Sequence, residues 1–322
     1  MPLPNDELNR WWVDVEVTDP AFSNSLRSSL VAFLTLDRNR NPIDLGSGFI
    51  IAAQGNWALA VTAKHVIIEF AARVQGRRQS APSALFAPPN EPSLHPGNIR
   101  AFWLSGGHAN ALEIKHVEYN ENIDIALCVL KTQEAYSNPF EPVAIPLDTG
   151  SARSGDEVFL VSCGITPAEE IEPPLGRDGI GQKVKLENGV AIRAGVVTGV
   201  YHNGYRQYRW PCFTTSIPAE PGMSGGFIYR ALPNSTVQAL GVICADNSDD
   251  AAVKSYLSCG ESVVGSAWSA LALSVLINEK GEVVRRTLFD LMQRGSIPAP
   301  SSLGHISIVS LDNGGYTITC RG

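Results

Sequence analysis

Apolar and polar positions alternate over many short stretches of this chain. Runs such as "SLVAFLTL", "GSGFIIA", "WALAVTA" and "EVFLVSCG" are rich in Val, Ile, Phe and Trp, and turn residues separate each run from the next. Runs of this length and composition predict β-strands rather than helices. They form two groups of similar size on either side of a Pro-, Gly- and Ser-rich stretch from Ser137 to Gly155. The pattern therefore predicts an all-β protein with two six-stranded antiparallel β-barrels.

Four parts of the chain follow from this pattern. We predict an N-terminal arm, a first barrel, a second barrel and a C-terminal extension, over residues 1–24, 25–140, 152–278 and 279–322. Residues 73–97 hold five prolines and little periodicity, which predicts a long exposed insertion in the first barrel.

The C-terminal extension contains two further elements. "RRTLFDLMQRGS" predicts a short helix that stops at Gly295, and "HISIVSLDNGGYTITC" predicts a β-hairpin that turns at Asn313–Gly315.

Composition narrows the partners of the protein. The 25 basic and 32 acidic residues among 322 give a net charge of −7, with no long basic run. Nucleic acid and anionic membrane surfaces are therefore excluded as main partners. No stretch approaches the roughly 18 apolar residues of a membrane span. The N-terminus also lacks the charged flank and apolar core of a secretory signal.

The six cysteines are scattered, without a Cys-x-x-Cys pair or a metal-type His/Cys cluster. We expect free thiols in a reducing cytoplasm, no metal and no cofactor. A disulfide that involves Cys212, Cys259 or Cys320 remains the alternative.

Three short segments carry candidate chemistry. His65 follows an apolar strand in "VTAKHV", Asp124 opens the run "IDIALCVL", and Ser224 lies between glycines in "PAEPGMSGGFIY". Taken alone, each segment also fits a purely structural role: a structural histidine, a turn aspartate or a glycine-rich loop. Their combination fits nucleophilic catalysis, because a serine hydroxyl needs an imidazole to take its proton and a carboxylate to fix the imidazole tautomer.

The glycines around Ser224 add a second requirement of that chemistry. They allow backbone conformations that side chains forbid, so the N–H groups of Gly222 and Ser224 can point into one cavity and stabilise an oxyanion.

With these motifs in this order, the sequence resembles the trypsin-like, chymotrypsin-fold serine proteases, and within them the bacterial heat-shock type, which lacks the disulfides of the secreted digestive enzymes. The likeness runs from about Ser29 to Ile277. "GSGFII" and "VTAKHV" are similar to the strand pair that leads to the catalytic histidine, "IDIALCVL" to the aspartate strand, and "TTSIPAEPGMSGGFIY" to the approach to the nucleophile.

The resemblance implies a role for each of these residues. His65 would be the general base, Asp124 its orienting carboxylate, Ser224 the nucleophile, and the Gly222 and Ser224 amides the oxyanion hole. A peptide or protein substrate would add as a strand along Val242, Ile243, Cys244 and Ala245. The substrate side chain that precedes the scissile bond would lie in a pocket near Pro218, Ala219 and the "GSAW" segment. The strand "GSAWSALALS" would form a wall of this pocket.

Three departures from the family pattern bear on activation and specificity. Val66 follows His65, so the disulfide beside the histidine is absent. Met223 stands where zymogen-activated relatives have the Asp that holds a newly cut N-terminus. We therefore expect no activation by N-terminal cleavage, although a protein partner could gate activity. Pro218 replaces the acid that selects Lys or Arg, so specificity for basic residues is not expected.

Two other interpretations remain open from the sequence. "GMSGG" also satisfies the Gly-x-Ser-x-Gly pattern of α/β-hydrolase esterases, for which Asp290 and His305 would complete the triad. Alternatively, the scaffold has lost turnover and serves as a peptide-binding or signalling module.

Overall fold

The structure is a computed structural model, and it describes residues 12–36, 42–67, 100–105, 108–132, 140–166, 187–206, 208–220, 222–230, 237–244, 262–299, 306–310 and 316–320. The predicted insertion over residues 73–97, the turn at 313–315 and Ala245 lie outside these ranges.

Six strands in the first half of the chain close into a barrel. In barrel order they are β2 (Leu30–Leu36), β3 (Pro42–Gln54), β4 (Trp57–Thr62), β7 (Ala126–Thr132), β6 (His108–Tyr119) and β5 (Arg100–Ser105). All neighbouring pairs are antiparallel. The interior is filled by apolar side chains that include Phe33, Ile50, Trp103 and Leu130. Alternation of these residues with more polar ones is what the pattern of a barrel strand requires.

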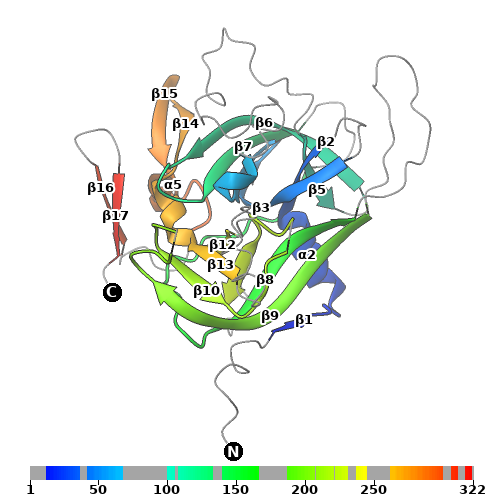
Figure 1. Cartoon of the computed structure of the whole chain (residues 1–322). Helices are drawn as coiled ribbons and strands as arrows, with labels where there is room; N and C mark the ends of the chain where they lie inside the picture. Colours follow the sequence, from blue (N-terminus) through cyan, green and yellow to red (C-terminus); the bar gives the residue numbers. More distant parts are fainter. Residues whose placement is uncertain are drawn as a thin grey trace, which may run out of the picture.

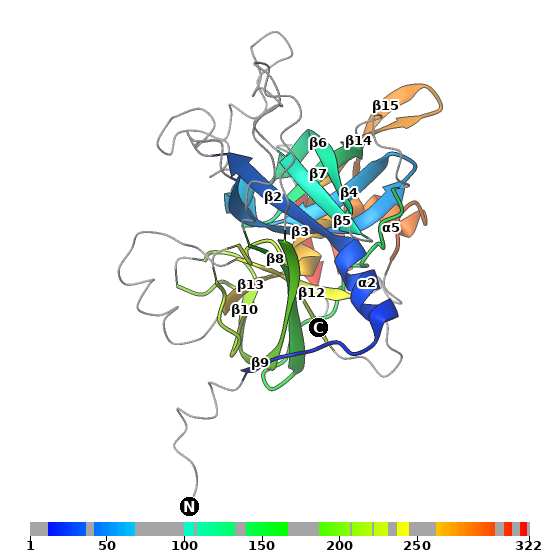
Figure 2. The same ribbon diagram turned by 90° about the vertical axis from the view of Figure 1, so that its right-hand side faces the viewer.

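A second group of six strands closes in the same way. In barrel order they are β8 (Glu157–Thr166), β9 (Glu187–Tyr201), β10 (Cys212–Thr215), β13 (Ser262–Ser266), β12 (Ala239–Ile243) and β11 (Phe227–Arg230). A short strand, β1 (Trp12–Asp14), is added to β9. Figure 2 shows the first barrel above the second. The predicted all-β class with two six-stranded antiparallel barrels is confirmed.

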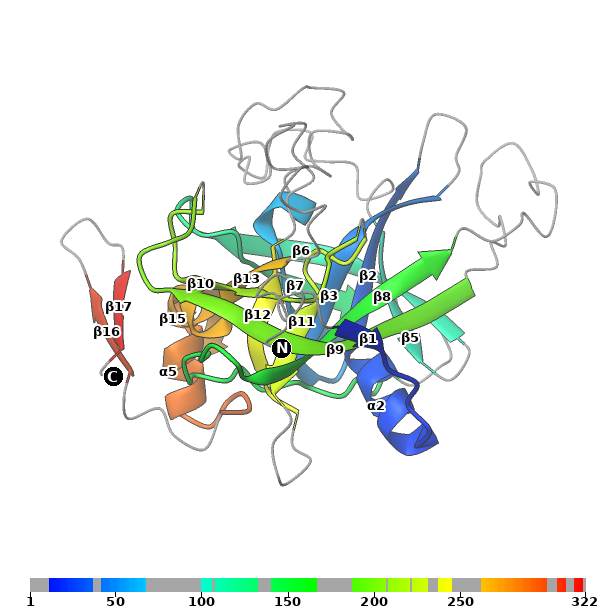
Figure 3. The ribbon, with the colours of Figure 1, turned by 60° about the horizontal axis from the view of Figure 1, so that its bottom comes forward.

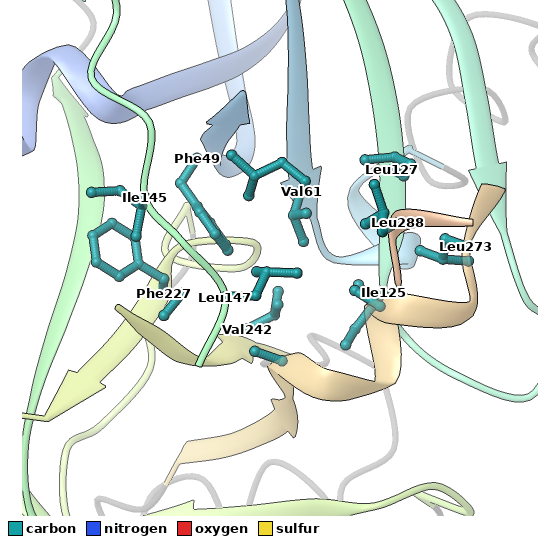
Figure 4. Close-up of a cluster of buried hydrophobic side chains, with 14 of the residues drawn as sticks. Phe49, Val61, Ile125, Leu127, Ile145, Leu147, Phe227, Val242, Leu273 and Leu288 are labelled. Carbon is teal, nitrogen blue, oxygen red and sulfur yellow. The ribbon is translucent and has the colours of Figure 1, made fainter. Parts of the chain in front are cut away.

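One hydrophobic core joins the two barrels (Figure 4). The rings of Phe49 in the first barrel and Phe227 in the second lie 5.0 Å apart, centroid to centroid. The segment between the barrels crosses this core, where Ile145 donates a backbone hydrogen bond to Ile50 and Leu147 is fully buried. Because apolar side chains from both halves are buried together, the two barrels are held in a defined position relative to each other.

A helix that the sequence did not predict precedes β2, the first strand of the first barrel. Helix α2 (Pro20–Ser29) begins after Asp19, whose carboxylate accepts a hydrogen bond from the amide of Ala21, and a proline occupies its first turn. Both are standard signals for a helix start. The helix and β1 place the N-terminal segment along the outside of both barrels (Figure 1).

The C-terminal region differs in part from the prediction. The predicted short helix is α5 (Leu288–Gln293), and the predicted hairpin strands are β16 (Ile306–Ser310) and β17 (Tyr316–Cys320). A second hairpin, β14 (Ser274–Glu279) and β15 (Glu282–Thr287), was not predicted. Its two turn residues, Lys280 and Gly281, both have positive φ, as type I′ turns require. None of the helices in the described part of the chain is long and apolar enough to cross a membrane.

The expected pocket-wall strand "GSAWSALALS" is wrong over most of its length. Strand β13 ends at Ser266, and Ala267–Ala272 forms the 3-10 helix η3. The physical reason is the spacing of its apolar positions: Ala267, Ala270 and Leu271 are all buried, a helical rather than alternating period.

Candidate active site

His65 and Asp124 meet at one end of the first barrel. The His65 ring nitrogen Nδ1 lies 2.8 Å from Asp124 Oδ2, and the His65 backbone amide donates to Asp124 Oδ1 at 2.9 Å. The carboxylate is buried, whereas a quarter of the histidine side chain is exposed. A carboxylate only accepts hydrogen bonds, so the neutral imidazole carries its proton on Nδ1 and leaves Nε2 as an acceptor.

The local sequence explains why these two side chains meet. Strands β4 and β7 are antiparallel neighbours, with Thr62 opposite Ala126, so the residue that follows β4 lies beside the one that precedes β7. A helical turn starting at Lys64 directs His65 back toward this end, and Lys64 Nζ donates to the carbonyl of Glu121. Three hydrogen bonds therefore connect the histidine segment to the aspartate segment.

Ser224 lies in a tight turn that belongs to the second barrel. The amide of Gly226 donates to the carbonyl of Met223, and the amide of Gly225 donates to the carbonyl of Ile243 in β12. Gly222 and Gly225 have φ of +90° and +84°, a region that favours glycine. Ser224 itself is 4% exposed. The glycines on both sides of the serine therefore serve the backbone conformation, as the sequence predicted.

The turn around Ser224 packs closely against the first barrel. A Cβ atom added to Gly225 would lie 2.0 Å from the carbonyl oxygen of Ser47 and 3.0 Å from the amide of Ala63. A Cβ atom on Gly46 would lie 2.7 Å from the carbonyl of Ser224 and 2.6 Å from the side chain of Val66. The backbone around Ser224 therefore packs directly against β3 and the segment that carries His65.

Ser47 is a contributor that the sequence did not single out. Its amide donates to the carbonyl of Ser224 at 2.7 Å, and its hydroxyl donates to the carbonyl of Gly222 at 2.9 Å. The same hydroxyl accepts from the amide of Cys163. Ser47 lies in "GSGF" within β3, so a hydroxyl between two glycines was the signal that could have found it. It connects three segments of both barrels at the serine turn.

Cys244 joins the second barrel to the aspartate segment. Its thiol donates to the carbonyl of Asp124 at 3.2 Å. Burial, and then the nearby Asp124 charge, raise the pKa of this thiol well above its ordinary value. The thiol therefore stays protonated and serves as a donor. Cys128, Cys163 and Cys212 are also free and buried.

The predicted substrate-binding residues have different surroundings. Val242 and Ile243 are fully buried in β12, which pairs with β11 on one side and β13 on the other. Neither edge of the strand is open there, so an added strand cannot pair with these two residues. The predicted strand addition is therefore wrong for Val242 and Ile243, and its part at Cys244 and Ala245 stays a prediction. Pro218 and Ala219 are half-buried, in the segment between β10 and Ser224.

The esterase alternative does not fit this architecture. A nucleophile elbow joins a strand to a helix, whereas Ser224 leads directly into strand β11. Asp290, its candidate acid, lies in α5, where its carboxylate accepts the amide of Thr287 and its amide donates to the Thr287 hydroxyl. This capping box gives Asp290 a structural role. His305 lies outside the described residues.

Comparison with known proteins identifies the family. Residues 46–232 match the model of the trypsin-like peptidase domain. The chain belongs to this family. The match covers the segments of His65, Asp124 and Ser224, and membership in a trypsin-like peptidase family indicates a hydrolase. No curated protein matches the chain. The bacterial heat-shock subtype stays a prediction.

Two solved structures similar to this trypsin-like peptidase are Rv3671c from M. tuberculosis H37Rv, in a mutant, inactive form, and GrC. The first is 18% identical and aligns over 79% of this chain and 90% of its own, with a TM-score of 0.40. The second is 11% identical and aligns over 80% and 94%, with a TM-score of 0.42.

Proposed function

We propose that this protein is a serine endopeptidase in which Ser224 is the nucleophile. His65 Nε2 takes the hydroxyl proton as Ser224 Oγ attacks the substrate carbonyl carbon. The same proton then passes to the leaving amine, and the C–N bond breaks to leave an acyl-enzyme. Water attacks this ester with His65 again as base, and the acid product leaves with Ser224 restored.

The observation that carries this proposal is the hydrogen-bonded pair of His65 and Asp124, which lies against the Ser224 turn. A buried carboxylate that accepts both the Nδ1 proton and the backbone amide of one histidine fixes the position and tautomer of the ring. It also stabilises the imidazolium that forms during attack. Both hydrogen bonds leave Nε2, the nitrogen that has to act as the base, outside the contact with Asp124.

We place the oxyanion hole at the amides of Gly222 and Ser224, and the hydrogen bonds of the turn support the part of Ser224. The carbonyl and the N–H of one peptide unit point in opposite directions. Because Gly226 binds the Met223 carbonyl, the N–H of Ser224 in the same peptide unit is directed to the other side of the turn. A donor held in this way is worth about 3–4 kcal/mol of barrier in related chemistry.

Three variants and a peptide library test the proposal. Wild-type protein should hydrolyse internally quenched peptides, and Ser224→Ala and His65→Ala should not. His116→Ala is the matched control, because the His116 ring also faces a carboxylate, that of Glu118, at 3.5 Å. His116 lies within β6 opposite Val129 of β7, away from the strand ends that carry His65 and Asp124. The control should retain wild-type turnover. Equal turnover in Ser224→Ala and wild type would refute the assignment.

The alternative of a silent binding module is decided by the same experiment. That module would bind peptides without cleaving them, and Ser224→Ala would bind as well as wild type. An activating protein partner is a further expectation from the sequence: its presence would raise turnover of the wild type and leave Ser224→Ala inactive.

A further inference from the structure

Arg193 on strand β9 links the N-terminal strand to the turn that carries Ser224. Its side chain is only 10% exposed, and its guanidinium reaches two carboxylates. Nε donates to Asp14 Oδ1 at 3.1 Å, and Nη2 donates to Glu220 Oε1 at 2.8 Å. Asp14 is the last residue of β1 and lies directly opposite Arg193 in the strand pairing. Figure 3 shows β1 beside β9.

The third nitrogen of the guanidinium contacts the serine turn itself. Nη1 donates to the carbonyl of Pro218 at 3.3 Å and lies 3.7 Å from the sulfur of Met223, which is the residue before Ser224. The Met223 sulfur also accepts the amide of Glu220, and the Met223 amide donates to the carbonyl of Glu220. Contacts from Pro218, Glu220 and Met223 therefore converge on one guanidinium.

We propose that Arg193, anchored by Asp14, is a positioning residue that holds residues 218–223 in the conformation that aligns the Ser224 turn. This inference rests on the proposed function, because its effect on catalysis needs Ser224 as nucleophile. Met223 occupies the position at which zymogen-activated relatives have an acid that binds a new N-terminus. Here this position holds a thioether that contacts the guanidinium of Arg193, and a strand near the N-terminus fixes that guanidinium.

The chemistry of the guanidinium suits this task. Its planar fork of five donors contacts four groups in different directions at once, which a single ammonium cannot do. Burial makes the arrangement demanding, since a buried cation without its partners is strongly unfavourable. Glu220 and Asp14 are more than half exposed, so Arg193→Gln leaves no buried carboxylate without a partner.

The chain offers a direct probe of this segment, because it contains three methionines, Met1, Met223 and Met292. In protein labelled with ¹³C at the methionine methyl groups, Met223→Leu assigns the signal of Met223. We expect Arg193→Gln to shift and broaden that signal, while the Met292 signal in α5 stays in place. Arg286→Gln is the matched control, because Arg286 forms a comparable two-bond ion pair with Glu279 in the C-terminal hairpin. It should leave the Met223 signal unchanged.

Steady-state kinetics provide the second measurement. A misplaced catalytic loop costs about 10- to 100-fold in rate, so Arg193→Gln should lower kcat by that factor and leave KM within about threefold. Arg193→Lys should recover part of kcat, and Asp14→Asn should lose less than Arg193→Gln because Glu220 still holds the guanidinium. Arg286→Gln should match the wild type.

The outcomes separate this inference from the proposed function. Wild-type values of kcat and an unmoved Met223 signal in Arg193→Gln would overturn the role of Arg193, as would a rise in KM alone. If Arg193→Gln does not fold, Asp14→Asn and Glu220→Gln decide in the same way. If wild-type protein neither cleaves peptides nor reacts with a fluorophosphonate, the proposed function fails, and the methionine signals still decide whether Arg193 holds the segment.

Discussion

The two halves of the candidate site are held in position by different means. In the first barrel, the imidazole of His65 is fixed by a side-chain and a backbone hydrogen bond to one buried carboxylate, that of Asp124. In the second barrel, the Ser224 turn is fixed by its own backbone, through bonds to Ser47, Met223 and Ile243. His65 and Asp124 lie at the ends of two paired strands, so the barrel itself is enough to bring them together. A glycine-rich turn needs anchors from outside, and here Ser47 and Arg193 provide them.

Removal of either reacting group should have the largest effect. Ser224→Ala and His65→Ala should each reduce kcat/KM for a peptide substrate by about 10⁴-fold or more, because neither half can act without the other. The double variant should lose no more than either single one. Losses that add in the double variant would show that the two residues do not act as a unit.

Replacement of the orienting carboxylate should rank next. Asp124→Asn keeps the size of the side chain but presents the imidazole with an amide, which favours the wrong tautomer, and we expect a loss of about 10⁴ in kcat with little change in KM. Thermal unfolding of the variant should show that the barrel remains intact. A loss below about tenfold would mean that Asp124 only supports the local fold.

Close packing of the turn predicts a strong effect on stability. Gly225→Ala places a methyl group 2.0 Å from the Ser47 carbonyl at a φ of +84°. Strain and overpacking should together cost about 2–5 kcal/mol in the free energy of unfolding, measured in urea. Gly281→Ala is the control, because Gly281 has a φ of +93° and an open surrounding. It should cost only about 1 kcal/mol, and equal losses would contradict the packing argument.

The hydroxyl of Ser47 tests the anchoring from the first barrel. Ser47→Ala leaves the Cys163 amide and the Gly222 carbonyl without this partner, which should cost about 1–3 kcal/mol in stability and about tenfold in kcat. Ser29→Ala removes a similarly buried hydroxyl, bonded to the Leu26 carbonyl in α2, and should affect stability alone. Unchanged kcat in Ser47→Ala would assign Ser47 a purely structural role.

The smallest expected effect is a loss of folding stability at alkaline pH. Burial raises the pKa of Cys128 from its ordinary 9.0 to about 12, and that of Tyr229 from 10.0 to about 12. The folded protein therefore keeps these protons when the unfolded chain releases them. Their contribution to stability is complete below pH 9 and is lost progressively as the pH rises toward 12. The urea concentration at the midpoint of unfolding should decrease as the pH is raised from 8 to 10.5. The decrease should be smaller in Cys128→Ala.

The two barrels could be predicted from the sequence, because the alternation of apolar and polar residues is a local pattern. His65, Asp124 and Ser224 could be singled out from their motifs, the glycines beside Ser224 and the order of the three segments. The sequence did not reveal the contacts that Arg193, Ser47 and Cys244 make around the site. Each of these residues contacts a partner that is distant in the chain. The occupied edges of β12 and the helical turn of η3 depend on tertiary pairing, which a single apolar run does not reveal.

The most direct test of the central claim is covalent labelling. Purified protein is treated with a fluorophosphonate, and the modified peptide is located by mass spectrometry. We predict one adduct, on Ser224, that forms far more slowly in His65→Ala and Asp124→Asn and at the wild-type rate in His116→Ala. No adduct, or an adduct on another residue, would contradict the assignment of Ser224 as the nucleophile.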